Sequence, residues 1–308
     1  MILSQDTSLA AVAEAFSFYR THFKKFQDSA SESDQDTIGI EDCWVALSQA
    51  KSLGWINLNS EIRIGMDSLD LGSFDIDAYA HYSTALNGRI CTLVPGKVIL
   101  FPSPADLPDN RLWMDPPDGV RRFSAPFYAD LLASDFDVVL VACIDSADYD
   151  RPAFAARGIA AEDLPVDGSS PDLLRAMDRF ITVAGAAPGA VALHSGPGPA
   201  HSLAGALVAA YLVRRLGFSA EAAVAWIRML HPALLASAAP VSAAAAAACA
   251  GGSRRLAFLR SESLSERVLC RGGPRSPPAA GAWKLTRSAS EPERLRACDE
   301  APDVFDFC

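Results

Sequence analysis

The stretch Ala190–Gly205, AVALHSGPGPAHSLAG, constrains the fold of this chain more than any other part of the sequence. Its apolar run Ala190–Leu193 predicts a central strand, and the glycine- and proline-rich loop Gly196–Ala200 follows that strand. A long apolar helix is expected over Ser202–Leu216. A strand, a glycine-rich loop and a helix start together can cradle an anion, because free backbone N–H groups and the helix dipole converge there.

Strands and helices alternate on both sides of this stretch. The predicted strands are Ile90–Val94, Lys97–Phe101, the nearly all-apolar Phe136–Ile144, and a strand or turn over Ala161–Val166 that leads to Asp167. The predicted helices are Ser124–Ser134, Arg151–Arg157, Pro171–Ala186 and Ser219–Leu230, with a long proline-rich loop from Pro102 to Gly119. This alternation predicts an α/β fold with a mostly parallel sheet flanked by helices.

The two ends of the chain lack the alternation of strands and helices seen in the middle, so three parts are expected. In residues 1–87 the sequence predicts helices over Ser8–Asp28, Glu41–Leu53 and Asp75–Leu86. The aromatic residues Phe16, Tyr19 and Phe23 of the first helix are expected to pack in the core, as is Trp226 in the later helix Ser219–Leu230. Residues 88–235 carry the alternating elements. Residues 236–308 are low in complexity and are expected to be a disordered tail, without which the core folds.

Charge and cysteine usage narrow the function classes. The net charge of −10 argues against nucleic-acid binding and against an anionic membrane surface. The seven cysteines form no CxxC pair, which favours a reducing compartment, cytoplasmic or nuclear, and leaves zinc without ligand spacing. No cofactor or metal is expected: Asp145, Asp148 and Asp150 fit a solvated acidic loop better than a metal site.

One tail motif points to a partner. Arg287-Ser288-Ala289-Ser290-Glu291-Pro292 fits the pattern R-S-x-S-x-P, which 14-3-3 proteins bind once the second serine is phosphorylated. Arg287, Ser290 and Pro292 are therefore candidate residues for recruiting a phosphoserine-binding protein.

Several segments together resemble one enzyme family. They are FDIDAYAH, VPGK, FSAPFYADL, LPVDGSSP, AVALHS and FSAEAAVAWIRMLHP, and they run in continuous order over roughly residues 74–232. The chain resembles the dual-specificity protein tyrosine phosphatases of the cell-division-cycle-fourteen type, which act in mitotic exit. More weakly, Ser8–Asp28 and Thr37–Ile62 resemble two ends of that family's N-terminal domain with its middle deleted.

The resemblance implies site residues by position. In such phosphatases a His-Cys pair, five residues, Arg and Ser/Thr lie between a strand and a helix. Here His194 and Ser195 stand at the first two positions, and Gly196, Gly198 and Ala200 lie within the loop. His201 stands at the arginine position, Ser202 retains the hydroxyl, and Asp167 stands at the position of the general acid.

The changed positions predict impaired catalysis. A serine hydroxyl stays protonated near neutral pH without a dedicated base, whereas the family's low-pKa cysteine attacks phosphorus as a thiolate. Histidine lacks the bidentate fork of arginine. Pro197 and Pro199 have no N–H to donate to phosphate. We therefore expect a pseudophosphatase acting as a binding or scaffold module for a phosphoprotein or protein partner. The alternatives are an active phosphoprotein phosphatase with an atypical loop and a degenerate gene product.

Other roles are open for the same residues. His194 fits a structural or orienting role at the strand end, and His201 fits either a weak cationic phosphate ligand or a neutral helix-opening residue. Asp167 equally fits an N-cap of the following helix. A serine hydrolase built from Ser195, His201 and Asp167 is disfavoured, because no GxSxG elbow is present and Ser and His share one loop.

Overall fold

The computed structural model describes residues 1–3, 5, 7–25, 38–56, 74–144, 150–164, 170–196 and 199–235, with the backbone alone at 170, 171, 195 and 199–201. All of them belong to one compact unit, Met1–Ser261, and the second unit, Glu262–Cys308, falls outside the described residues.

A five-stranded sheet organises the described chain. It consists of β1 (Cys91–Val94), β2 (Val98–Pro102), β5 (Val138–Cys143), β6 (Ala160–Asp163) and β7 (Ala190–Ser195), in the order β1-β2-β7-β5-β6. β1 and β2 are antiparallel, and the β2–β7, β7–β5 and β5–β6 pairs are parallel. The predicted mostly parallel sheet is confirmed, and so is the central place of β7, whose Val191, Ala192 and Leu193 are fully buried.

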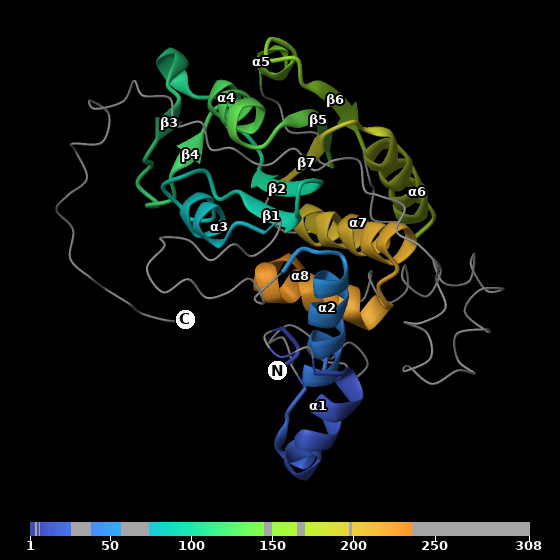
Figure 1. Ribbon diagram of the computed structural model, residues 1–308. Helices are drawn as coiled ribbons and strands as arrows, with labels where there is room; N and C mark the ends of the chain where they lie inside the picture. The colour runs from blue at the N-terminus through green and yellow to red at the C-terminus, as the bar shows by residue number, and fades with distance from the viewer. Residues whose placement is uncertain are drawn as a thin grey trace. The chain divides into compact units, whose positions relative to one another are not determined.

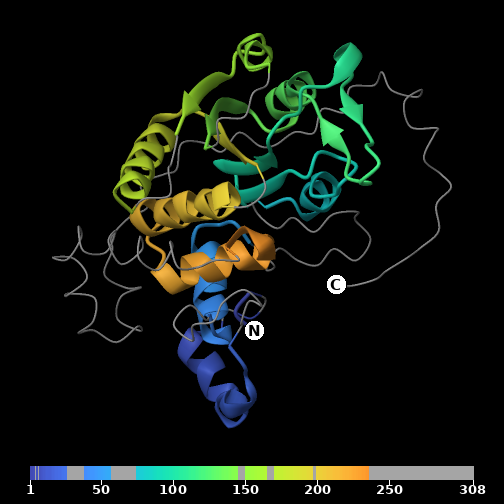
Figure 2. The same cartoon turned by 180° about the vertical axis from the view of Figure 1, so that it is seen from behind.

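Helices cover both faces of this sheet (Figures 1 and 2). α4 (Ala125–Asp135) and α5 (Pro152–Ala155) pack on one face, around Phe101, Tyr128 and Phe154. On the other face lie α6 (Ser170–Ala186) and α7 (Pro199–Leu216), and α8 (Ala220–Leu230) packs against α7. α8 begins where predicted, because the Ser219 hydroxyl accepts a hydrogen bond from the Ala222 N–H at 3.1 Å.

The N-terminal part lies against α8. α2 (Ile40–Ser52) packs on α8 through Ala46 and Ala50, which are fully buried. Trp55 follows α2 and lies 5.3 Å from Trp226 of α8, measured between ring centroids. α3 (Ile76–Tyr82) is capped by Asp75 and is shorter than the predicted Asp75–Leu86.

The first predicted helix is wrong in extent and in its packing. The structure has α1 (Leu9–Ala15) and then a 3-10 helix, η1 (Ser17–His22), in place of one helix over Ser8–Asp28, whose last three residues lie outside the described residues. Within α1 and η1, Val12 is the only buried side chain. Tyr19 and Phe23 are exposed rather than core, and Phe16 is half-buried: Phe16 and Phe23 contact Trp44 of α2, but this contact leaves their outer sides in water. Trp226 is buried as predicted.

Part of the predicted loop from Pro102 to Gly119 is ordered. It contains a 3-10 turn, η3 (Pro108–Asn110), and β3 (Trp113–Met114), which pairs with β4 (Arg122–Phe123). A strand of only two residues is too short to show the alternation of apolar and polar residues by which strands are predicted.

The described chain ends in η4 (Pro232–Leu235), which is part of the core. Leu234 and Leu235 are fully buried, and the Arg228 guanidinium donates to the Leu235 carbonyl oxygen at 2.9 Å. Leu235 is thus the last core residue of the described chain, and the periodic apolar positions of the sequence end at the same place. The tail, including Arg287, Ser290 and Pro292, lies outside the described residues.

Candidate functional site

The carboxyl ends of the parallel strands share one edge of the sheet. In the strand register Pro102 pairs with Ser195, while Cys143 pairs with both His194 and Asp163. Ligands of open α/β sheets bind outside this edge, since loops and helix N-termini converge there. The predicted loop therefore lies at the edge where a parallel sheet places its ligands.

The loop after β7 is shorter than the sequence suggested. β7 ends at Ser195, Gly196 follows, Pro197 and Gly198 lie outside the described residues, and α7 begins at Pro199 rather than at Ser202. Proline suits the first helical position, because its fixed φ is helical and its missing N–H would have no partner within the helix. Ala200, His201 and Ser202 consequently belong to the first turn of α7, and Ser202 is half-buried.

His194 is enclosed within the sheet. Its side chain is fully buried, its Nδ1 lies 3.2 Å from the Ser103 hydroxyl, and its ring centroid is 5.3 Å from that of Phe101. Ser103 follows the carboxyl end of β2, so this contact ties the neighbouring strand to the start of the loop. These contacts are compatible with a residue that orients the loop, and that role stays a prediction.

Asp167 lies outside the described residues, but the elements on both sides of it are described. β6 precedes it, and the Leu164 N–H donates to the Cys143 carbonyl oxygen at 2.7 Å. α6 follows it. A pocket of about 170 Å³ adjoins both elements, lined by Asp163, Leu164, Asp172, Arg175, Ala176 and Arg179. Whether Asp167 is a general acid or a helix cap stays a prediction.

Arg151 is a residue at this edge that the sequence analysis did not single out. Its guanidinium donates to both oxygens of Asp163, at 2.7 and 2.8 Å, and lies 4.0 Å from the Cys143 sulfur. A second cation, Arg179, bonds Glu162 at 2.7 Å. Both arginines are paired with a carboxylate, so neither adds an unbalanced positive charge at this edge of the sheet. Arg151 immediately precedes α5 and Asp163 ends β6, so the ion pair joins the two ends of this short segment, and no local sequence pattern predicts it.

None of the cysteines that the structure describes lies in the loop after β7. Cys43 is half-buried on α2, where burial raises its pKa, while Cys91 and Cys143 are buried. Cys91 lies on the edge strand β1, and burial raises its pKa to about 12. Cys143 is next to His194 in the sheet but is 3% exposed. A structural thiol buried in this way is inert as a nucleophile.

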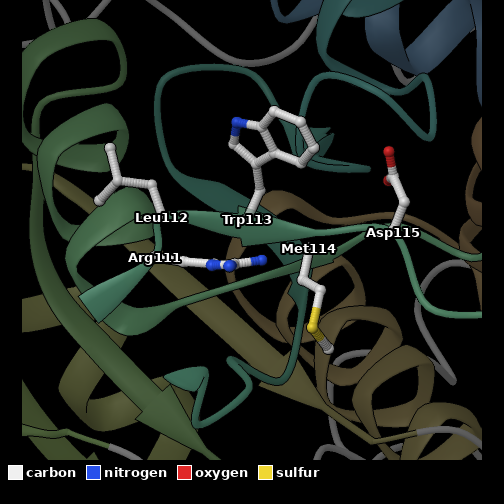
Figure 3. A pocket seen from close by; sticks show the side chains of 5 residues that line it. All are labelled: Arg111, Leu112, Trp113, Met114 and Asp115. Carbon is white, nitrogen blue, oxygen red and sulfur yellow. The ribbon is translucent and has the colours of Figure 1, made fainter. Parts of the chain in front are cut away.

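A larger pocket of about 490 Å³ lies elsewhere, on the short β3–β4 sheet (Figure 3). Its lining residues are Arg111, Leu112, Trp113, Met114 and Asp115. The Arg121 guanidinium stacks 4.0 Å above the Trp113 ring and bonds Asp115 at 2.7 Å. Size alone does not make this hollow the chemical centre, because none of its lining residues comes from the loop after β7 or the strands beside it.

The described residues offer neither a metal site nor a membrane span. No group of three or more His, Cys, Asp or Glu among them is placed to hold a metal ion. Asp150 is exposed, and Asp145 and Asp148 lie outside the described residues. No helix that the structure describes is long and apolar enough to cross a bilayer.

Comparison with known proteins places these features in a family context. The chain is 28% identical over 220 residues to the dual specificity protein phosphatase CDC14C of Homo sapiens, a match that covers 71% of this chain and 44% of the relative. It is 26% identical over 211 residues to the tyrosine-protein phosphatase cdc-14 of Caenorhabditis elegans, covering 68% of this chain and 26% of the relative. The chain is a relative of the CDC14 phosphatases.

The match to the CDC14 relatives has a definite extent. Spanning 220 residues, it is longer than the range 74–232 that carries the family-like segments, so it takes in residues on at least one side of it. The chain spans less than half the length of these relatives. No family model matches the chain. Among solved structures, PTPMT1 superposes with a TM-score of 0.38 at 16% identity, covering 54% of this chain and 99% of that one.

The relationship to CDC14 proteins agrees with the α/β fold, its mostly parallel sheet and its flanking helices. The chain therefore contains a dual-specificity phosphatase-like domain.

Proposed function

We propose that this chain is a pseudophosphatase, a phosphatase-like domain that binds protein and does not turn over phosphate esters. One observation carries the proposal: Ser195 ends β7 and His201 lies in the first turn of α7, the positions of the nucleophile and the phosphate-binding arginine in the family pattern. This assignment of positions comes from the family pattern, and the strand-to-helix connection between β7 and α7 supports it.

The replaced groups supply most of the chemistry of this enzyme class. A thiolate attacks phosphorus without a base, whereas a serine hydroxyl must lose its proton during the attack. Arginine holds two equatorial oxygens through parallel charge-assisted hydrogen bonds, and histidine offers one donor at a time. Both the attack on phosphorus and the neutralisation of the transition state are weakened.

The loop also has fewer backbone donors. Pro197 and Pro199 carry no N–H, and each missing hydrogen bond to a charged oxygen is worth about 1.5–3 kcal/mol. Pro199 occupies the first position of α7, which faces the anion in a cradle of this kind. Phosphate binding is therefore weakened together with catalysis.

The hydrolysis of a generic aryl phosphate tests the proposal. We expect no turnover by the full chain above that of the Ser195→Ala variant. Robust turnover that Ser195→Ala abolishes would instead establish an active phosphatase with an atypical loop.

The remaining function is protein binding. We infer a phosphoprotein or protein partner in the cytoplasm or nucleus, supported by the phosphatase-like domain, the negative net charge and the unpatterned cysteines. Localisation of the tagged full chain tests the compartment, and a secreted product would contradict it.

The tail motif supports a second route to a partner. Phosphorylated Ser290, with Arg287 and Pro292 at the motif spacing, is proposed to recruit a 14-3-3 protein. Peptides spanning residues 284–295, with and without phosphate on Ser290, would be titrated with a 14-3-3 protein. Equal affinity of the two peptides would refute this role.

A further inference from the structure

A group of exposed aromatic and basic side chains lies on η1 and the residues after it. We call it the basic aromatic patch: Phe18, Tyr19, Arg20, Phe23, Lys24 and Lys25. Phe18 is 79% exposed and Tyr19 is 54% exposed. Neighbouring large apolar side chains in water mark an interaction surface more often than isolated ones do.

One ring of the patch packs against α2. Phe23 packs edge-on against Trp44 of α2, with ring centroids 6.3 Å apart, and Phe16 contacts both rings, at 6.2 Å from Phe23 and 5.6 Å from Trp44. Phe18 and Tyr19 contact each other edge to face at 5.4 Å. Phe23 is therefore anchored on α2, while Phe18 and Tyr19 each have only two side-chain χ angles to order on binding, a low entropy cost that favours their use as contact residues.

The charge of the patch opposes that of the whole chain. Arg20, Lys24 and Lys25 lie within six residues of sequence in a chain of net charge −10. Arg20 pairs with Glu41 at 2.9 Å, with both side chains largely in water, so the pair is weak and exchangeable. Neither lysine has an ion-pair partner among the described residues. The surface therefore offers cations next to apolar rings.

We propose that the basic aromatic patch binds an acidic peptide segment of a partner protein that also carries aromatic or aliphatic side chains. Carboxylates of such a segment would meet Lys24 and Lys25, and its apolar side chains would cover Phe18 and Tyr19. Burying the rings supplies affinity, while the charges set the orientation and the association rate. This binding function is separate from the loop after β7 and does not depend on phosphate recognition.

An anionic membrane is the other surface that basic aromatic segments bind. A membrane extends well beyond the patch and faces the rest of a strongly negative chain, whereas a peptide interacts within roughly one Debye length, about 8–10 Å. Repulsion from the rest of the chain therefore acts against the membrane and not against a short peptide. The charge balance favours the peptide.

The experiment measures binding of a labelled synthetic peptide to the full chain by fluorescence anisotropy. The peptide alternates Asp or Glu with Phe or Leu, and two control peptides carry Ser in place of either the acidic or the apolar residues. We expect the first peptide to bind at least about tenfold more tightly than either control, with an affinity that falls as salt is added.

Variants locate the binding site. Phe18→Ser and the double change Lys24→Glu, Lys25→Glu are each expected to weaken binding by about tenfold or more. The matched controls are Leu86→Ser, at a side chain 57% exposed, and Arg89→Glu combined with Arg111→Glu, which alters net charge equally. The controls are expected to bind as the wild type does, and equal losses in control and patch variants would overturn the proposal.

Acidic residues also follow the patch in sequence, at Asp28, Glu32, Asp34 and Asp36. A variant with Asp28→Asn, Glu32→Gln, Asp34→Asn and Asp36→Asn removes any competition from their charges. Peptide binding absent from both the wild type and this variant would refute the proposal. Binding to vesicles of phosphatidylcholine and phosphatidylserine, without binding to the peptide, would assign the patch to a membrane and equally overturn it.

Discussion

The strand β7 and the loop that follows it are neighbours in sequence and differ in what has been kept. Val191, Ala192 and Leu193 are fully buried between β2 and β5, as a central parallel strand requires. The next residues, Ser195 to His201, carry none of the reactive groups of the related phosphatases. Packing and chemistry therefore vary independently in this unit, because the sheet is stabilised by burial and not by the groups at its edge.

The largest expected effect comes from restoring the chemistry of the loop. Ser195→Cys, Pro197→Ala, Pro199→Leu and His201→Arg together should create measurable aryl-phosphate hydrolysis, at least about 100-fold faster than Ser195→Cys alone. The reason is that one transition-state donor is worth about 10²–10³-fold in rate. A single variant as active as the combined one would show that the nucleophile alone had been lost.

The role of Asp167 is tested in the same assay. Asp167→Ala in the combined variant should lower the rate by about 10²–10⁴-fold, the range for general acid catalysis. An unchanged rate would instead assign Asp167 to the helix start.

Substitutions in β7 test whether the strand contributes to stability and the loop does not. Leu193→Ala should lower the free energy of unfolding by about 2–5 kcal/mol, because it leaves a cavity in a fully buried strand. Ser195→Ala, two residues later, removes a single oxygen atom and should change it by less than about 0.5 kcal/mol. Denaturant unfolding would measure both, and equal losses would remove the distinction between strand and loop.

A smaller effect is expected where α7 meets the end of the described chain. A Cβ atom added at Gly205 would lie 2.4 Å from the Leu235 Cδ2 atom and 3.0 Å from the Leu234 carbonyl oxygen. Gly205→Ala should therefore displace η4 and destabilise the fold by about 1–3 kcal/mol, despite the better helix propensity of alanine. Stabilisation, measured by thermal unfolding, would show that η4 does not pack there in solution.

The smallest expected effect is a pH dependence at the end of α8. Burial lowers the pKa of His231 below its usual value of about 6.5. Below that pH the unfolded chain takes up a proton more readily than the folded one, so stability is lost as the pH falls. His231→Gln should make the unfolding midpoint less sensitive to pH below 6.5, and an unaltered slope would contradict this.

The sequence predicted the elements whose signals are local. β7 and β5 were evident from apolar runs, and α8 from its Ser219 cap. Tyr19 and Phe23 were misplaced because a helical repeat of apolar residues does not say whether a second surface covers it. β3 and β4 are too short to leave a pattern, and the ion pair between Arg151 and Asp163 joins residues twelve positions apart that no motif links.

The sequence also predicted one part of the candidate site and missed another. The family-like spacing predicted Ser195, His201 and Asp167 as site residues, and the strand register places Ser195 at the carboxyl edge of the sheet, while the roles of all three stay predictions. The early start of α7 was missed, because the preference of proline for the first helical position was outweighed by the apparent Gly/Pro loop.

The contact between Trp55 and Trp226 gives the molecule an optical reporter. Their ring centroids are 5.3 Å apart at an interplanar angle of 44°, and the Trp226 indole N–H donates to the Leu93 carbonyl oxygen at 2.9 Å. Two indoles held this close and at a fixed tilt couple their electronic transitions, which gives an exciton signal in circular dichroism. Because one ring follows α2 and the other belongs to α8, that signal reports whether the N-terminal helices stay attached, without any label.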